Sequence, residues 1–136
     1  MAATATRDET LPVQSSTDVV HVRQVVRALA TSIGLSLVDQ TKIVTAASEL
    51  ARNTLEHGGG GTARLQVIED GARRGVKLTF EDKGPGIADM KLALTDGYTT
   101  GGGMGLGLSG SRRLVNEFDI VSSPGQGTRV TVTRWK

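Results

Sequence analysis

Glycine is the residue that most constrains how this chain can fold. The sequence has 18 glycines among 136 residues, about twice the usual share of roughly 7%. Many of them are clustered at residues 58–61, 84–86, 101–107 and 125–127, between stretches with helical or strand periodicity. Because glycine lets a backbone adopt unusual angles and approach other groups closely, the positions of these clusters decide how the sequence is interpreted.

Length and residue content exclude several classes of protein. A chain of 136 residues suits one domain, and we predict a flexible tail over 1–9 and a single domain over 10–136. The sequence has no cysteine, which excludes disulfides and zinc fingers, and two histidines are too few for a histidine metal cage. No apolar run is long enough to span a membrane, and the first residues lack the apolar core of a signal peptide. We therefore expect a cytoplasmic protein.

Charge and aromatic content disfavour nucleic-acid binding. The 16 Lys and Arg residues and the 14 Asp and Glu residues give a net charge of +2 and are interleaved, whereas nucleic-acid binders usually carry a clustered basic stripe. Two Phe, one Tyr and one Trp leave little surface for stacking on bases. The core must therefore be built from Val, Leu, Ile and Ala.

The first part of the chain predicts a short strand and two helices. Residues 10–14 alternate polar and apolar side chains, as a strand does. Ser15 and Ser36 each stand three residues before an Asp, a pattern typical of helix starts. Apolar residues spaced three and four apart follow each serine, and we expect the two helices to end at Gly34 and at His57.

The second part of the chain predicts strands on both sides of a third helix. Alternating polar and apolar residues predict strands at 62–68 and 76–80, joined by a hairpin loop at 69–75. A helix is expected at 105–118, and two further strands at 119–123 and 128–134. Helices grouped early and late around hairpin strands indicate a two-layer α/β sandwich with a mostly antiparallel sheet.

Residues 103–108 form a glycine box at the expected start of the third helix. Backbone amides at a helix N-terminus attract anions, and glycines let a phosphate come close to them. Residues 105–110 also match the GxGxxG dinucleotide pattern. We reject that interpretation because the pattern needs a preceding strand, which residues 98–102 cannot form. A flexible glycine-rich turn is the alternative.

Two further groups of polar residues carry candidate chemistry. Glu49 and Asn53 are four residues apart on the second helix, so they share a face and can offer oxygens to a water and to Mg²⁺; a solvated polar face is the alternative. Asp82 ends a strand just before Gly84 and Gly86. Its carboxylate can accept a hydrogen bond from an exocyclic amine, or it can cap its own loop as an Asx turn. We assign His57 only to the end of its own helix.

Taken together, these motifs resemble the GHKL ATPase superfamily, which includes gyrase, MutL, histidine kinases and the bacterial anti-sigma serine kinases. The matching motifs, in chain order, are Glu49–Asn53, Asp82–Gly86, Gly103–Gly107 and Gly127–Thr128. The resemblance covers nearly all of residues 10–135 and is nearest to the short serine kinases of the RsbW/SpoIIAB/RsbT group, in particular the RsbT-type switch kinases. It implies the Bergerat-type ATP-binding fold, with a mostly antiparallel mixed sheet covered by three helices.

The resemblance also implies roles for individual residues, with ATP and Mg²⁺ as cofactors. Asn53 would hold Mg²⁺, Glu49 would be the general base, Asp82 would bind the adenine amino group and Thr128 would support it through water. Arg52 is the nearest candidate for a cation at the γ-phosphate. The remaining residues expected to contact the nucleotide are Gly84, Gly86, Ile87, Thr99, Gly103, Gly105, Leu106, Gly107 and Leu108, with Thr99–Gly102 as a short lid.

The function implied by the resemblance is protein phosphorylation in a signalling switch. The substrate would be a serine or threonine on a STAS-domain antagonist, and the kinase would then activate a PPM-type serine phosphatase in bacterial stress or sigma-factor regulation. The alternative is an anti-sigma factor that sequesters a sigma factor, with ATP binding as a conformational switch. A third hypothesis, a nucleotide-binding module without catalysis, is disfavoured by Glu49 at the position of the base.

Overall fold

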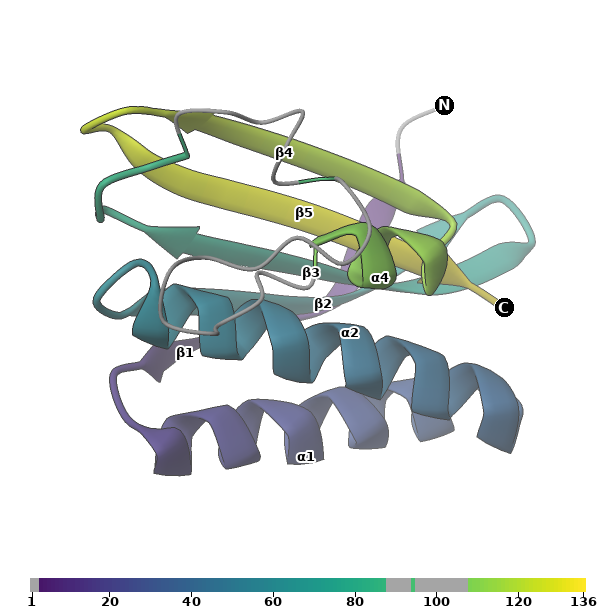
Figure 1. The fold of residues 1–136 in the computed structure, drawn as a ribbon. Helices are drawn as coiled ribbons and strands as arrows, with labels where there is room; N and C mark the ends of the chain where they lie inside the picture. The colour runs from purple at the N-terminus through teal and green to yellow at the C-terminus, as the bar shows by residue number, and fades with distance from the viewer. Residues whose placement is uncertain (1–2, 88–93, 95–107) are drawn as a thin grey trace.

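The computed structural model describes residues 3–87, 94 and 108–136. In chain order, the elements of this part are β1 (Thr4–Val13), α1 (Ser16–Ser32), α2 (Leu37–Glu56), β2 (Gly61–Asp70), β3 (Arg73–Asp82), α4 (Leu108–Arg113), β4 (Glu117–Ser123) and β5 (Gly127–Trp135). The strands form one sheet in the order β1-β2-β3-β5-β4, and its neighbouring strands are antiparallel. Figure 1 shows this sheet as one layer, with the antiparallel pair α1 and α2 covering one of its faces. The predicted two-layer α/β sandwich is confirmed.

The two long helices begin where the sequence predicts. The side chain of Ser15 accepts a hydrogen bond from the backbone N–H of Asp18 at 3.2 Å, and that of Ser36 accepts one from Asp39 at 3.1 Å. Such N-caps each stabilise a helix by about 1 kcal/mol. After α1 the chain turns at Gly34, whose φ of +81° suits glycine. Local sequence therefore sets the boundaries of both helices.

The core lies between the helices and the inner face of the sheet. It is mainly aliphatic, as the composition predicts, and Phe80 on β3 is its one fully buried aromatic side chain among the described residues, 1% exposed. Its largest other fully buried apolar members are Ile43, Leu50, Leu65, Leu78, Val13, Val22, Val26, Val76 and Val132. Within the same described ranges, no helix has the length and apolar character that a membrane span requires.

The predicted tail over 1–9 is wrong for residues 4–9, which belong to β1. They pair with β2 from Thr4 opposite Glu69 to Glu9 opposite Leu65. The side chains of residues 3–10 are exposed, so no apolar alternation marks this part of the strand. Backbone pairing holds it to the edge of the sheet, together with a bidentate ion pair. In this pair Arg64 Nε donates to Asp8 Oδ1 at 2.9 Å and Arg64 Nη2 donates to Asp8 Oδ2 at 2.5 Å.

Two other boundaries differ from the prediction. The helix expected over 105–118 ends at Arg113 within its described part, and residues 117–118 belong to β4. Asn116 explains the change, because its N–H donates to Thr133 O at 2.9 Å and its side chain accepts from Trp135 N at 2.7 Å, which draws the chain onto β5. The hairpin loop expected over 69–75 shortens to residues 71–72, since ion pairs between charged residues beside the turn favour strand pairing.

Candidate functional site

A small cavity, with about 20 Å³ of free space, lies where the end of α2 meets the end of β3, the start of β5 and the start of α4. In Figure 1 the end of α2, the end of β3 and the start of β5 lie at the left, and α4 lies right of centre. The lining of the cavity is half apolar and half polar. The apolar residues are Leu50, Phe80, Ile87, Leu108 and Val130, and the polar residues are Asn53, Thr54, His57, Asp82 and Thr128. The fold thus brings together five residues predicted for the site, namely Asn53, Asp82, Ile87, Leu108 and Thr128.

Asp82 and Thr128 form the polar wall of the cavity. They are direct partners in the register of β3 and β5, and their exposed fractions are only 8% and 9%. Gly84 N–H donates to Asp82 Oδ1 at 2.9 Å, so the Asx-turn interpretation is correct for that oxygen. Oδ2 accepts no hydrogen bond from the described residues. Oδ2 is not one of the fully buried unpartnered atoms, so it is open to a ligand that donates a hydrogen bond.

Four glycines pack tightly around Asp82. A methyl group added at Gly58 would collide with the Asp82 carboxylate, and one added at Gly84 would collide with the Gly58 backbone. Gly86 and Gly127 have φ angles of +75° and +82°, and added methyl groups there would strike the carbonyl oxygens of Ser123 and Asp82. The space that Gly84 and Gly86 leave is thus taken by protein backbone, and their contact with a base stays a prediction.

The sequence interpretation missed the role of Ser122, which links two parts of the cavity wall. Its Oγ accepts a hydrogen bond from Ile87 N–H at 2.8 Å, and lies 3.0 Å from Gly127 O and 2.8 Å from Thr128 Oγ1. On the strand β4, Ser122 falls on the same face as Phe118 and Ile120, which pack against the core. A serine in that apolar row was the signal in the sequence that pointed to this link.

His57 is a second missed residue. Besides ending α2, it lines the cavity, and its Nε2 lies 3.3 Å from Gly86 O. The histidine therefore ties the end of the helix to the loop after Asp82. Its position four residues after Asn53 places it on the same face of the helix, which is the signal that could have found it.

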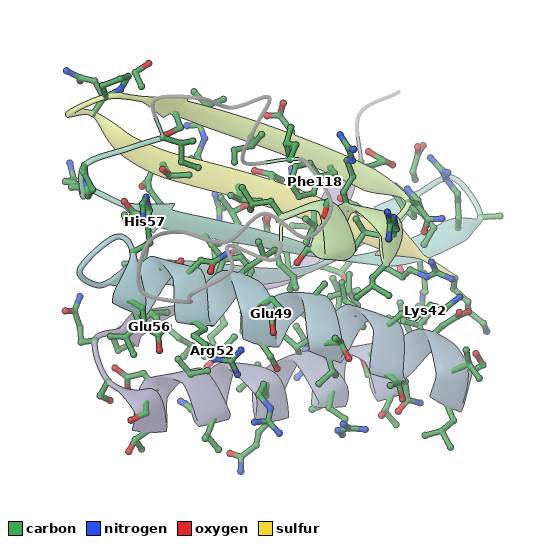
Figure 2. All side chains as sticks on the ribbon, in the orientation of Figure 1. Lys42, Glu49, Arg52, Glu56, His57 and Phe118 are labelled. Atoms are coloured by element: carbon green, nitrogen blue, oxygen red, sulfur yellow. The ribbon has the colours of Figure 1, made fainter. Side chains whose placement is uncertain are left out.

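Glu49 and Arg52 form an ion pair beside the cavity rather than inside it. Arg52 Nη1 donates to Glu49 Oε1 at 2.9 Å, and the side chains are 46% and 38% exposed, respectively. Figure 2 shows both residues on α2, with Glu56 and His57 farther along toward the helix end. Glu49 lies one turn before Asn53, which does line the cavity. Arg52 thus contacts the carboxylate of Glu49, and its predicted contact with a γ-phosphate stays a prediction.

The remaining predicted site residues lie outside the described part of the chain. They are Thr99, Gly103, Gly105, Leu106 and Gly107, together with the lid expected over 99–102. Among residues 3–87, 94 and 108–136, no group of three or more His, Asp or Glu side chains could hold a metal ion. A metal bound through Asn53 would therefore take most of its ligands from water and from a second molecule, as Mg²⁺ commonly does.

The comparison with family models assigns the chain to a class. Residues 38–136 match the model of the histidine kinase-, DNA gyrase B- and HSP90-like ATPases, and the chain belongs to this family. The match covers α2, the cavity and every strand of the sheet except β1. The family predicted from the sequence is confirmed, and with it the class of ATP-using enzymes to which that prediction assigned the chain.

Individual relatives narrow the class. The chain is 42% identical over 118 residues to the serine/threonine-protein kinase RsbT of Bacillus subtilis, covering 87% of this chain and 89% of that protein. It is 30% identical over 118 residues to an anti-sigma F factor of a Thermoanaerobacter species, covering 83% and 82%. In fold it resembles the solved RsbU and RsbW domains of a Mycobacterium tuberculosis protein, with a TM-score of 0.63 and 24% identity. That alignment covers 98% of this chain and 32% of the solved one.

Proposed function

We propose that this protein is an ATP-dependent protein serine/threonine kinase of the RsbT type that acts as a partner switch. Its substrate is a serine or threonine of a STAS-domain antagonist, and its second partner is a PPM-type serine phosphatase in a stress or sigma-factor pathway. One observation carries the nucleotide-binding part of the proposal, namely the buried Asp82 carboxylate with an unbonded oxygen at the wall of the cavity. The similarity to the RsbT kinase supports the reaction and the partners.

Recognition of adenine follows from the polarity of the cavity. Asp82 Oδ2 can accept a hydrogen bond from the exocyclic amine, while Ile87 and Leu108 contact the faces of the ring. The free space enclosed by these residues is only about 20 Å³, so the cavity would have to widen as the base enters, with the phosphates of ATP extending beyond it past Asn53.

Asn53 fits the magnesium ion that accompanies ATP in this family. Its side-chain amide supplies the hard oxygen ligand that Mg²⁺ prefers, and Mg²⁺ keeps several waters and phosphate oxygens as its other ligands. When bound, the ion neutralises charge on the phosphates. Asn53→Ala is accordingly expected to weaken binding of Mg-ATP severely, as measured by calorimetric titration; unchanged affinity would remove Asn53 as the metal ligand.

Glu49 is the proposed general base. It stands one turn from Asn53 and outside the cavity, where the hydroxyl group of a second protein can reach it. The ion pair with Arg52 at 2.9 Å orients the carboxylate. It accepts the proton of the serine or threonine hydroxyl as that oxygen attacks the γ-phosphorus and the bond from this phosphorus to the β,γ-bridging oxygen breaks, releasing ADP. Phosphoryl transfer depends chiefly on such positioning, on neutralisation of charge and on one base.

The function is tested by Glu49→Gln, which keeps the shape of the side chain but cannot accept the proton. Loss of a general base costs on the order of 10²–10⁴-fold in rate, so we expect near-normal ATP binding with transfer to the STAS-domain protein reduced by that factor. Glu56→Gln, an exposed residue two turns later on α2, is the matched control and should transfer normally. Radiolabelled transfer and nucleotide titration on the same preparations give both readouts. Full transfer by Glu49→Gln would remove Glu49 as the base.

The second candidate function is sequestration of a sigma factor, with ATP as a conformational switch. The similarity to an anti-sigma F factor at 30% identity favours it. Purified protein with ATP can be mixed with STAS-domain proteins and sigma factors of the same host. Tight binding of a sigma factor by the wild type, without phosphate transfer to any STAS-domain protein, would support sequestration over the kinase switch.

A further inference from the structure

We infer that Ser122 is a positioning residue that fixes the direction of the Thr128 hydroxyl and thereby the preference of the cavity for an amino-bearing base. The inference rests on the proposed function, because it concerns how ATP is distinguished from other purine nucleotides. It is carried by the hydrogen bonds of three residues in the cavity wall, Ile87, Ser122 and Thr128.

The hydrogen-bonding capacity of a serine hydroxyl determines the assignment. A hydroxyl has one hydrogen to donate and two lone pairs that accept. Ile87 N–H, 2.8 Å from Ser122 Oγ, can only donate, and Gly127 O, 3.0 Å away, can only accept. The hydrogen of Ser122 therefore goes to Gly127, and one of its lone pairs to Ile87. The contact with Thr128 Oγ1 at 2.8 Å then takes the second lone pair, with Thr128 as the donor.

This assignment leaves Thr128 without a hydrogen to donate into the cavity. Thr128 Oγ1 therefore presents only lone pairs to the cavity, as Asp82 Oδ2 does. The two side chains, which are register partners on β3 and β5, thus both act as acceptors. An adenine amino group carries two N–H donors and suits such a wall, directly or through a water. The 6-oxo oxygen of inosine or guanine is an acceptor, and it would leave these buried groups without a donor.

The geometry of β4 makes Ser122 the residue on which this polarity depends. Ser122 is half-buried and lies directly opposite Thr128 in the pairing of β4 and β5. Without its hydroxyl, Thr128 would be able to rotate its hydrogen into the cavity and bond to a 6-oxo group. Ser123, the next residue, is exposed and points to the other face of the strand, so it offers a matched control.

The test compares binding of ATP with binding of inosine triphosphate, which differs at the 6-position of the base. Ser122→Ala should lower the ATP-to-inosine-triphosphate affinity ratio by roughly fivefold or more, the factor that corresponds to about 1 kcal/mol. Ser122→Thr, which keeps the hydroxyl, and Ser123→Ala should both keep the wild-type ratio. An unchanged ratio in a folded Ser122→Ala protein that still binds ATP would overturn the inference.

A double-mutant cycle separates this role from a structural one. Thr128→Val removes the hydroxyl that Ser122 is inferred to direct, so adding Ser122→Ala to that variant should change the ratio no further. If the two substitutions instead lower the ratio independently, Ser122 does not act through Thr128 and the inference is wrong. Failure of the wild type to bind ATP at all would overturn the proposed function, which distinguishes the two failures.

Discussion

The two ends of the sheet are built in opposite ways. At the end near Asp82, the strands and loops meet through glycines, and one oxygen of the Asp82 carboxylate accepts no hydrogen bond from the described residues. At the other end, large side chains fill the space. The Arg73 guanidinium lies 3.8 Å from the centre of the Trp135 ring, and Trp135 Nε1 donates to Glu117.

Charge reinforces the contrast between the ends. Near Trp135, Arg73 pairs with Asp70 at 3.1 Å and Arg74 with Glu69 at 3.0 Å. The end near Asp82 has no ion pair of this kind across its strands among the described residues. The contrast fits the proposed function, in which one end of the sheet contributes stability and the other binds a ligand, because polar groups left unsatisfied cost stability and persist where they serve function.

The largest effect is expected from Gly127→Ala, which would fill the tight packing at the Asp82 end. Alanine at a φ of +82° costs about 1–2 kcal/mol, and its methyl group would also collide with the Asp82 carbonyl. We expect the free energy of unfolding, measured with urea, to fall by more than that amount.

Gly125→Ala is the control for Gly127→Ala. Gly125 has a φ of +76°, but a methyl group there meets no atom within 4 Å among the described residues. The control should therefore show the backbone cost alone. Equal losses in the two variants would contradict the packing described around Asp82.

A second prediction separates binding from stability at the same end. Asp82→Ala removes the acceptor for adenine, at a cost of roughly 1–3 kcal/mol in ATP binding, and should also reduce the preference for ATP over GTP. Its effect on the free energy of unfolding should be smaller, since the carboxylate is incompletely bonded in the free protein. Titration with ATP and GTP checks this. Equal binding of the two nucleotides by the wild type would mean that Asp82 has another role.

The reverse pattern is expected from Arg134 near the other end. Its side chain is only 16% exposed, and the guanidinium pairs with Asp39 of α2 at 2.7 Å, which ties the last strand to a helix. Arg134→Ala should lower the free energy of unfolding by about 1–3 kcal/mol and leave the affinity for ATP unchanged. Arg129→Ala, an exposed arginine on the same strand, should change stability by less than about 0.5 kcal/mol. A loss of ATP affinity in Arg134→Ala would contradict the separation of stability at one end of the sheet from nucleotide binding at the other.

The smallest effect concerns the edge strand β1. The hydrogen bond from Arg64 holds the pKa of the Asp8 carboxyl below its ordinary value of 3.8. A carboxyl with a lowered pKa in the folded state adds stability above the ordinary pKa and loses it as the pH falls through the lowered value. The difference in free energy of unfolding between wild type and Asp8→Asn should therefore be small, be present at neutral pH, and be lost as the pH falls through the lowered pKa. A difference independent of pH would exclude the ion pair as its source.

Much of the helix layer could be predicted from the sequence because its signals are local. Ser15 and Ser36 cap their helices through hydrogen bonds three residues away, and apolar spacing marks the buried faces. Five of the ten residues that line the cavity were predicted from the order of the motifs, and the fold brings Asn53, Asp82 and Thr128 together. Their chemical roles toward ATP remain predictions.

The features that sequence reasoning missed depend on partners far along the chain. Residues 4–9 look like a tail because their side chains are polar, and only pairing with β2 makes them a strand. Ser122 gains its role from Ile87, 35 residues away, and His57 from Gly86, 29 residues away. The sequence does not show these long-range partners, and only the position of each residue on its strand or helix face could have indicated them.

The central claim, that ATP binds at the glycine-lined end of the sheet, is tested most directly by two-dimensional NMR of backbone amides during titration with Mg-ATP. The account predicts saturable shifts at Gly58, Gly84 and Ile87, while Gly71 and Arg73 in the β2–β3 hairpin stay in place. Shifts confined to the hairpin end, or saturating binding without change at the three site amides, would contradict it.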